Sequence, residues 1–96
     1  MTLEEQLDLV VDERTFLDFV HALAIDREDE VRKEKTKSSS PYGPGANGWE
    51  NGTIEAFLEA ACSWGRSSFH GLPLYEKSTN PWRRCADILH MGKLYE

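Results

Sequence analysis

The chain has 96 residues, of which 17 are acidic and 11 basic, giving a net charge of −6 at pH 7. This length suits one domain with a modest core, and a hydrophobic content of 40% is ordinary for a globular protein. The negative charge is concentrated in residues 1–30, which sum to −8. Such a surface argues against binding a nucleic-acid backbone, which requires positive charge. It suits a basic protein partner, although a solubilising role is the commoner explanation of such charge.

The sequence carries no targeting or disulfide signal. Its only apolar run near the start, residues 7–11, is short, contains an acid and has no basic segment ahead of it. We therefore expect neither a signal peptide nor a membrane span, and a cytoplasmic location follows as the default. Cys62 and Cys85 are too few for a disulfide scaffold, and their apolar neighbours indicate two buried core thiols.

The first main helix is predicted over residues 12–36, with Asp12 as its N-cap. Its apolar residues recur at helical spacing and define one face: Phe16, Phe19, Val20 and Leu23. Beyond Asp26 the sequence is polar on almost every side, so we expect a solvated and mobile extension supported by ion pairs between residues four apart. Ahead of this helix, Thr2 and Glu5 fit a capping box, and a short fourth helix or an extended apolar strap both remain open.

Residues 36–52 are rich in Pro, Gly and Ser and predict a long loop, which in a small domain is usually functional or disordered. The glycines do not match a phosphate-binding motif, because no Gly-Lys-Ser/Thr follows them. Tyr42 and Trp49 are the aromatic residues that we expect to pin this loop. Trp49 also stands just before the next helix, where it can fold back onto Ile54 or Phe57.

The second main helix is predicted over residues 53–64, with Asn51 or Thr53 as its cap and Gly65 as its C-terminal stop. Another loop follows this helix. The sequence therefore places two loops between three amphipathic segments and shows no run that predicts a sheet.

The third main helix is predicted over residues 81–91, with Asn80 as the cap and a proline at the first helical position. Gly92 is expected to end it. Arg83 and Arg84 lie in its first turns and are expected to be solvated.

These segments predict an all-α, single-domain bundle covering residues 1–96, with three main helices and one long loop. Large apolar and aromatic side chains should dominate its core: Trp49, Phe57, Trp64, Trp82, Phe16, Phe19, Leu23, Leu58 and Leu89.

Candidate chemistry is sparse. Asp87 and His90 lie three residues apart on one helix and could bind one metal ion together with a cysteine. However, the sequence lacks the closely spaced ligand pairs that are typical of zinc sites. A partly exposed histidine near a helix C-terminus explains His90 equally well. A cysteine nucleophile needs a nearby base and an exposed setting, which neither cysteine offers if both are buried.

Two blocks of the sequence resemble an uncharacterised bacterial family of small domains. One block joins residues 40–44, 48–51 and 53–60, and the other joins residues 80–89 and 92–96. Together with the first main helix, the similarity covers most of the chain. The resemblance implies no activity. Small acidic bacterial domains of this kind include immunity proteins, which act by binding a toxin, and by analogy this favours a binding module.

We therefore expect a cytoplasmic, non-enzymatic interaction protein without a cofactor, comparable with an immunity protein. The candidate partner-binding residues are two loop aromatics and four acids of the first main helix: Tyr42, Trp49, Asp26, Glu28, Asp29 and Glu30. The acids would steer a basic partner and the aromatic rings would anchor it. The alternatives are a small metal or cysteine enzyme and a self-associating helical module.

Overall fold

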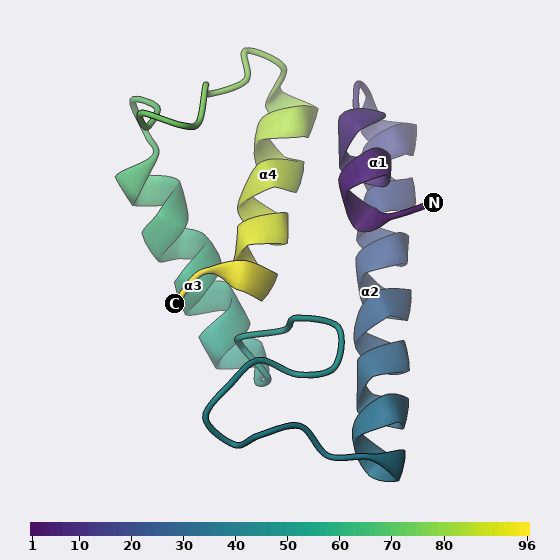
Figure 1. Ribbon diagram of the computed structural model, residues 1–96. Helices are drawn as coiled ribbons and strands as arrows, with labels where there is room; N and C mark the ends of the chain where they lie inside the picture. Colours follow the sequence, from purple (N-terminus) through teal and green to yellow (C-terminus); the bar gives the residue numbers. More distant parts are fainter.

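Four helices make up the computed structural model, which describes all 96 residues. They are α1 (Leu3–Asp8), α2 (Glu13–Thr36), α3 (Ile54–Ser67) and α4 (Pro81–Leu94). α4 stands between α2 and α3 and packs against both, whereas α2 and α3 do not pack directly against each other (Figure 1). α1 folds back along α2 and also contacts α4. The predicted all-α fold with three main helices is confirmed.

Side chains cap the start of every helix. Thr2 and Glu5 exchange hydrogen bonds in a complete capping box, so the N-terminal segment is a short helix and not a strap. Asp12 caps α2, Thr53 caps α3 in preference to Asn51, and Asn80 caps α4. The positions of the helix starts can therefore be predicted from local sequence, because each capping side chain accepts a hydrogen bond from a backbone N–H group within three residues of it.

The helix ends differ from the prediction. Gly65 and Gly92 stop neither helix, since α3 and α4 each continue two residues further. Side chains from elsewhere in the chain satisfy the carbonyl groups at these ends instead. Arg84 Nη2 donates to the Gly65 carbonyl at 2.9 Å, and Asn51 Nδ2 donates to the Gly92 carbonyl at 2.9 Å. With these carbonyls satisfied, no left-handed glycine is needed to end the helix.

The core lies where α1, α2 and α4 meet and where the long loop closes over them. Its buried side chains are Leu7, Val10, Phe19, Leu23, Trp49 and Ala86. Phe16, Phe57 and Leu89 are partly buried against this cluster, and Trp64 is buried between α3 and α4 with Tyr75 at a centroid distance of 4.8 Å. Seven of the nine predicted core residues therefore lie in or against the interior.

Two predicted core residues and both cysteines are wrongly placed by the sequence analysis. Leu58 is 55% exposed and Trp82 is 37% exposed, and Cys62 and Cys85 are also exposed. The reason is the arrangement of the helices. Because α3 packs on α4 alone, the flank of α3 that carries Leu58 and Cys62 has no neighbouring helix. Trp82 lies in the first turn of α4 and stacks at the edge of the core on Phe16.

The two glycines inside α3 and α4 should respond oppositely to alanine. A Cβ on Gly92 would lie 2.8 Å from Phe57 Cε1 and 3.0 Å from the Phe57 carbonyl oxygen, so Gly92→Ala forces the two helices apart. We expect a loss of about 1–2 kcal/mol in the free energy of unfolding, measured by urea denaturation.

Gly65→Ala is the matched control, because its Cβ would meet only Ile88 at an ordinary distance of 3.6 Å. Alanine has the higher helix propensity, so this variant should gain about 0.5–1 kcal/mol. Equal effects of the two substitutions would contradict the packing described for Gly92.

Candidate functional site

The long loop, residues 37–53, is held against α2 by a buried carboxylate. Glu30 is 1% exposed, and its Oε1 accepts hydrogen bonds from the backbone N–H groups of Asn47 at 3.0 Å and Trp49 at 3.2 Å. Its other oxygen pairs with Arg27. Gly45 lies so close to this carboxylate that a Cβ there would clash with it. A buried charge is tolerated only when paired and hydrogen-bonded, and Glu30 has both kinds of partner.

Asp26 forms a second anchor, one turn before Glu30. Its Oδ2 accepts a hydrogen bond from the indole Nε1 of Trp49 at 2.8 Å. The same oxygen forms an ion pair with Lys93 of α4 at 2.8 Å. Arg27 and Lys93 also lie 5.6 and 5.7 Å from the Trp49 ring, close enough for cation–π attraction. Trp49 is therefore buried by contacts with both α2 and α4, as its predicted role in pinning the loop requires.

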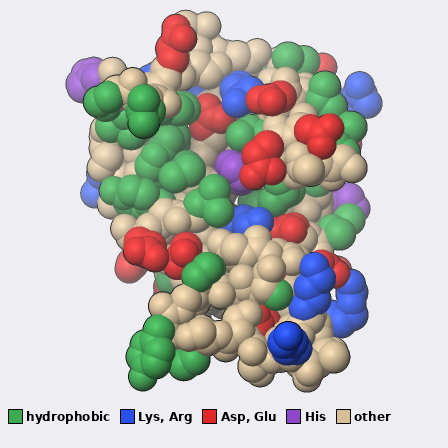
Figure 2. Space-filling model, in the orientation of Figure 1, with side chains coloured by type: hydrophobic (Ala, Val, Ile, Leu, Met, Phe, Trp, Pro, Cys, Tyr) green, Lys and Arg blue, Asp and Glu red, His purple; other side chains and the backbone are tan.

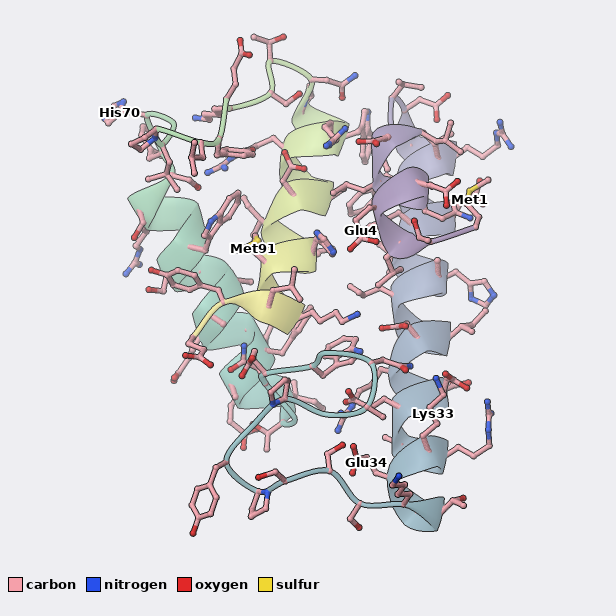
Figure 3. All side chains as sticks on the ribbon, in the orientation of Figure 1. Met1, Glu4, Lys33, Glu34, His70 and Met91 are labelled. Atoms are coloured by element: carbon pink, nitrogen blue, oxygen red, sulfur yellow. The ribbon has the colours of Figure 1, made fainter.

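Two further carboxylates of α2 hold the outer part of the loop. Glu34 accepts hydrogen bonds from the backbone N–H groups of Ser39 and Ala46, and Figure 3 shows it between α2 and the loop. Asp29 accepts from the side chain of Asn47 at 3.0 Å. Hydrogen bonds from Ser39 lower the pKa of Glu34, and the hydrogen bond from Asn47 lowers the pKa of Asp29. The polar half of α2 is therefore solvated on one side, as predicted, whereas the carboxylates on its other side hold the loop.

The six residues predicted as a binding surface therefore fall into two groups, one with contacts inside the chain and one exposed to solvent. Asp26, Asp29, Glu30 and Trp49 are engaged with the loop and with α4, as described above. Glu28 is exposed and has no ion pair, while Tyr42 is 98% exposed and does not pin the loop. The sequence contained a signal for this division, because Asp26 and Glu30 continue the buried stripe of Phe19 and Leu23 at helical spacing.

Acidic and basic side chains on the surface are separated along the long axis of α2. Figure 2 shows acidic side chains gathered over α1 and basic side chains gathered over the C-terminal end of α2. The basic residues at this end are Arg32, Lys33, Lys35 and Lys37. Asp29 forms ion pairs with Arg32 and Lys33, the second of these between residues four apart as predicted, whereas Glu28 forms none with Arg32 four residues on. Neutralisation of these acids within the chain leaves a smaller free acidic face than the composition suggests.

An apolar groove of about 310 Å³ lies between α2 and α3, where these two helices fail to pack together. Its apolar walls come from both helices and from the loop: Val20, Leu23, Ala24, Trp49, Ile54 and Phe57. The rings of Trp49 and Phe57 lie 5.9 Å apart and connect the walls. At the loop side of the groove, Arg27 Nη2 donates to the carbonyl of Gly52 at 3.1 Å.

The groove wall formed by α3 continues as an exposed apolar flank. Ile54 is 78% exposed, and Leu58 and Cys62 follow it at intervals of four residues, which places them on one side of the helix. Sequence reasoning assigned these residues to the core and missed the groove. The sequence did contain a signal for the groove. The apolar residues of α3 occupy a wider part of its circumference than its single neighbour, α4, can cover.

The polar residues of α4 anchor the second loop, contrary to the prediction that its arginines are solvated. Asp87 accepts hydrogen bonds from the Tyr75 hydroxyl at 2.7 Å and from Arg83 Nε at 2.8 Å. Arg84 donates to Ser68 Oγ and to the Tyr75 hydroxyl. Burial and the hydrogen bond to Asp87 raise the pKa of Tyr75. These contacts show that the charged groups of Asp87, Arg83 and Arg84 have a structural role, since each is paired or hydrogen-bonded within the chain.

His90 is buried between α4 and α1, where the prediction had it partly exposed. Its Nε2 has no hydrogen-bond partner, and the nearest carboxylate oxygen, on Glu4, is 3.9 Å away. Burial lowers the pKa of His90, against an opposing effect of Glu4. The structure does not bring Asp87, His90 and a cysteine together, and no three His, Cys, Asp or Glu residues are placed to hold one metal ion.

Comparison with known proteins places the domain in a family. The model of a family of unknown function, DUF7660, matches residues 12–96. The chain belongs to this family. Membership in a family of unknown function, expected from the two sequence blocks, is confirmed, and only residues 1–11, which contain α1, fall outside the match.

No curated protein and no solved structure matches the chain. None of the four helices combines the length and the apolar character that crossing a membrane requires. The family match therefore supplies no activity, and the function of the domain has to be inferred from its geometry.

The buried carboxylate of Glu30 should be essential for the loop. Glu30→Ala leaves two backbone N–H groups and Arg27 without their partner, so we expect a loss of about 3 kcal/mol in the free energy of unfolding, followed by tryptophan fluorescence in urea. Glu28→Ala, two residues away and exposed, should change it by less than about 0.5 kcal/mol. A small effect of Glu30→Ala would show that the loop is held by other contacts.

Stability should decrease on acidification through His90. The unfolded chain binds a proton near the ordinary histidine value of 6.5, whereas burial lowers the pKa in the folded chain. Stability is therefore unaffected by this group above pH 6.5 and falls as the pH drops from 6.5 towards the lowered value, by up to about 1.4 kcal/mol per pH unit. His90→Gln should remove this component and His21→Gln should retain it, as measured by urea unfolding between pH 5 and 8. A pH profile that His90→Gln leaves unchanged would rule out His90 as its cause.

Proposed function

We propose that the chain is a protein-interaction module that binds a partner in the groove between α2 and α3. The observation that carries this proposal is the groove itself, an open apolar surface between two helices that do not pack against each other. Its continuation over Ile54 and Leu58 is a contiguous exposed apolar strip, which on a small monomer typically marks a site of interaction. The groove volume lies at the lower end of the range for small-molecule sites, and a protein segment would also cover the exposed flank of α3.

The charge around this surface supports a basic partner. Glu55 and Glu59 lie one turn apart on the exposed side of α3. Neither takes part in an ion pair within the chain, in contrast to the acids that hold the loop. Because the chain also has a net charge of −6, these free acids would accelerate the encounter with a positively charged protein.

Tyr42 would add a second contact. It is almost fully exposed at the tip of the loop, and Pro41, Gly43 and Pro44 surround it in the sequence. Tyrosine is enriched among the residues that dominate binding energy, because its ring is large and has few rotamers. The acids that attach this loop to α2 would hold it ready for binding. We propose for this module a non-enzymatic, cytoplasmic role of the kind that toxin-neutralising proteins perform by binding.

The groove can be tested with a pair of aspartate substitutions. Ile54 lines the groove but is largely exposed, and Leu74 is fully exposed in the loop before α4, so Ile54→Asp and Leu74→Asp should both fold. Affinity capture from cells of the organism that encodes the protein, with quantitative mass spectrometry, should yield a protein that Leu74→Asp retains and Ile54→Asp loses. With the purified partner, Ile54→Asp should weaken Kd by roughly tenfold or more.

Charge reversal tests the electrostatic part separately. Glu55→Lys with Glu59→Lys should slow association with the purified partner and reduce its dependence on salt, measured by surface plasmon resonance. Reversal at Asp26, Asp29 or Glu30 is unsuitable, because it would release the loop. The proposal is overturned if no protein distinguishes the two aspartate variants.

A further inference from the structure

α1 covers a different crevice from the proposed partner groove. The groove between α2 and α3 uses Val20, Ala24 and Arg27, whereas the cavity beside α1 uses Ala22, Asp26 and Asp29 of the same helix. Positions 22 and 24 are 200° apart around an α-helix, so the two sites lie on opposite flanks of α2. α1 lies along the second flank, where it contacts both α2 and α4 (Figure 1).

The contacts of α1 follow the pattern by which an amphipathic helix fits a groove. Leu3, Leu7 and Val10 are spaced at i, i+4 and i+7, and they are the residues of the segment that pack in the core. Leu7 and Val10 are buried, whereas Glu5, Asp8 and Leu9 are exposed. The α2–α4 crevice therefore accepts a short helix through three aliphatic side chains.

α1 is an incomplete occupant of this crevice in two respects. First, with six residues it is about 9 Å long, and a cavity of about 640 Å³ continues past its N-terminus along α2, lined by residues that include Met1, Asp26, Asn47 and Lys93. Second, α1 leaves His90 Nε2 beneath it without a partner. Glu4 faces α4 on this side of α1 (Figure 3), but at 3.9 Å its carboxylate does not reach a hydrogen-bond distance.

α1 is also the shortest helix of the fold. A helix of this length has little stability of its own, so its helical state depends on burying Leu7 and Val10. It is joined to α2 by a short turn, and it lies entirely within residues 1–11, which the family model does not match. The matched domain, residues 12–96, provides the crevice without it.

We propose that α1 is a displaceable intrachain occupant of a helix-binding crevice between α2 and α4. The external ligand of this crevice is an amphipathic helix of a partner protein, longer than α1. It carries aliphatic residues at i, i+4 and i+7 and a carboxylate that reaches His90 Nε2. Such a ligand would make the hydrogen bond that α1 lacks and would fill the adjoining cavity, so it would compete with α1 for the same surface. This site is independent of the proposed groove between α2 and α3.

Native-state hydrogen exchange on the wild-type chain tests displacement without altering the fold. The amides of Leu9 and Val10 are hydrogen-bonded within the α1 turn, so they report its opening. We expect them to exchange at least tenfold faster than the slowest amides of α2 and α4. In His90→Phe, which removes the unpartnered nitrogen, exchange from α1 should slow by about tenfold. Exchange of α1 only with global unfolding, or no change in His90→Phe, would overturn the proposal.

Peptide binding tests the crevice directly. In a full-length Leu7→Asp/Val10→Asp chain, α1 should leave the crevice vacant. A fluorescein-labelled synthetic peptide of residues 1–11 should then bind this variant at least tenfold more tightly than it binds the wild type, while the Leu7→Asp peptide should bind neither. Equal binding to variant and wild type would contradict displacement. If the double variant does not fold, the exchange experiment alone decides.

A third arm separates the two sites. Adding Ile54→Asp to the Leu7→Asp/Val10→Asp chain should leave peptide binding unchanged, since Ile54 lies in the other groove. Formation of a dimer by wild-type chain that Ile54→Asp leaves intact and Leu7→Asp/Val10→Asp abolishes, measured by light scattering at rising concentration, would identify a second copy's α1 as the occupant and overturn the assignment to a partner protein. Failure of the α1 experiments would leave the groove between α2 and α3 untouched, and the converse also holds.

Discussion

The carboxylate of Glu30 is the interaction on which the arrangement of this domain depends. α2 is a single 24-residue helix, and most of the tertiary hydrogen bonds of its second half are made with the loop. Glu30 makes that contact favourable by accepting two backbone N–H groups of the loop and pairing with Arg27. A desolvated carboxylate is costly by several kcal/mol unless its lone pairs are used, and here they are. The absence of a side chain at Gly45 leaves the space that the carboxylate occupies.

From this anchor the contacts extend to both other long helices. Trp49 is positioned by its backbone bond to Glu30, and its ring then meets Asp26, Lys93 and Phe57. One aromatic side chain thus connects α2, α4 and α3, although α2 and α3 do not pack together. The groove between these two helices is a direct result, because the loop joins them at one end and leaves the space beside α4 open.

The same contacts change the meaning of the acidic composition. A net charge of −6 suggests a steering surface, but several of the acids in the first third of the chain are used as hydrogen-bond acceptors for the loop or as partners of lysine and arginine. Near the α2–α3 groove, the unpaired acidic charge lies instead on Glu55 and Glu59 of α3. Both interaction surfaces inferred here, the α2–α3 groove and the crevice under α1, are apolar surfaces along opposite flanks of α2.

Local sequence was sufficient to predict the three main helices and most of the core, because helix initiation depends on residues three or four apart and amphipathic spacing records which face is buried. It predicted Asp12 and Asn80 as caps and Phe19, Leu23, Trp49 and Trp64 as interior residues, and all are confirmed, whereas it left the conformation of residues 1–11 open. The remaining features depend on contacts between distant segments. The exposure of Leu58 and Cys62 depends on α3 having one neighbour, the helix ends depend on Arg84 and Asn51 from distant positions, and the burial of Glu30 depends on a loop 17 residues away in the chain. The type of a residue indicates whether it prefers to be buried or exposed. Its actual surroundings depend on which segments of the chain meet in space, and local sequence does not contain that information.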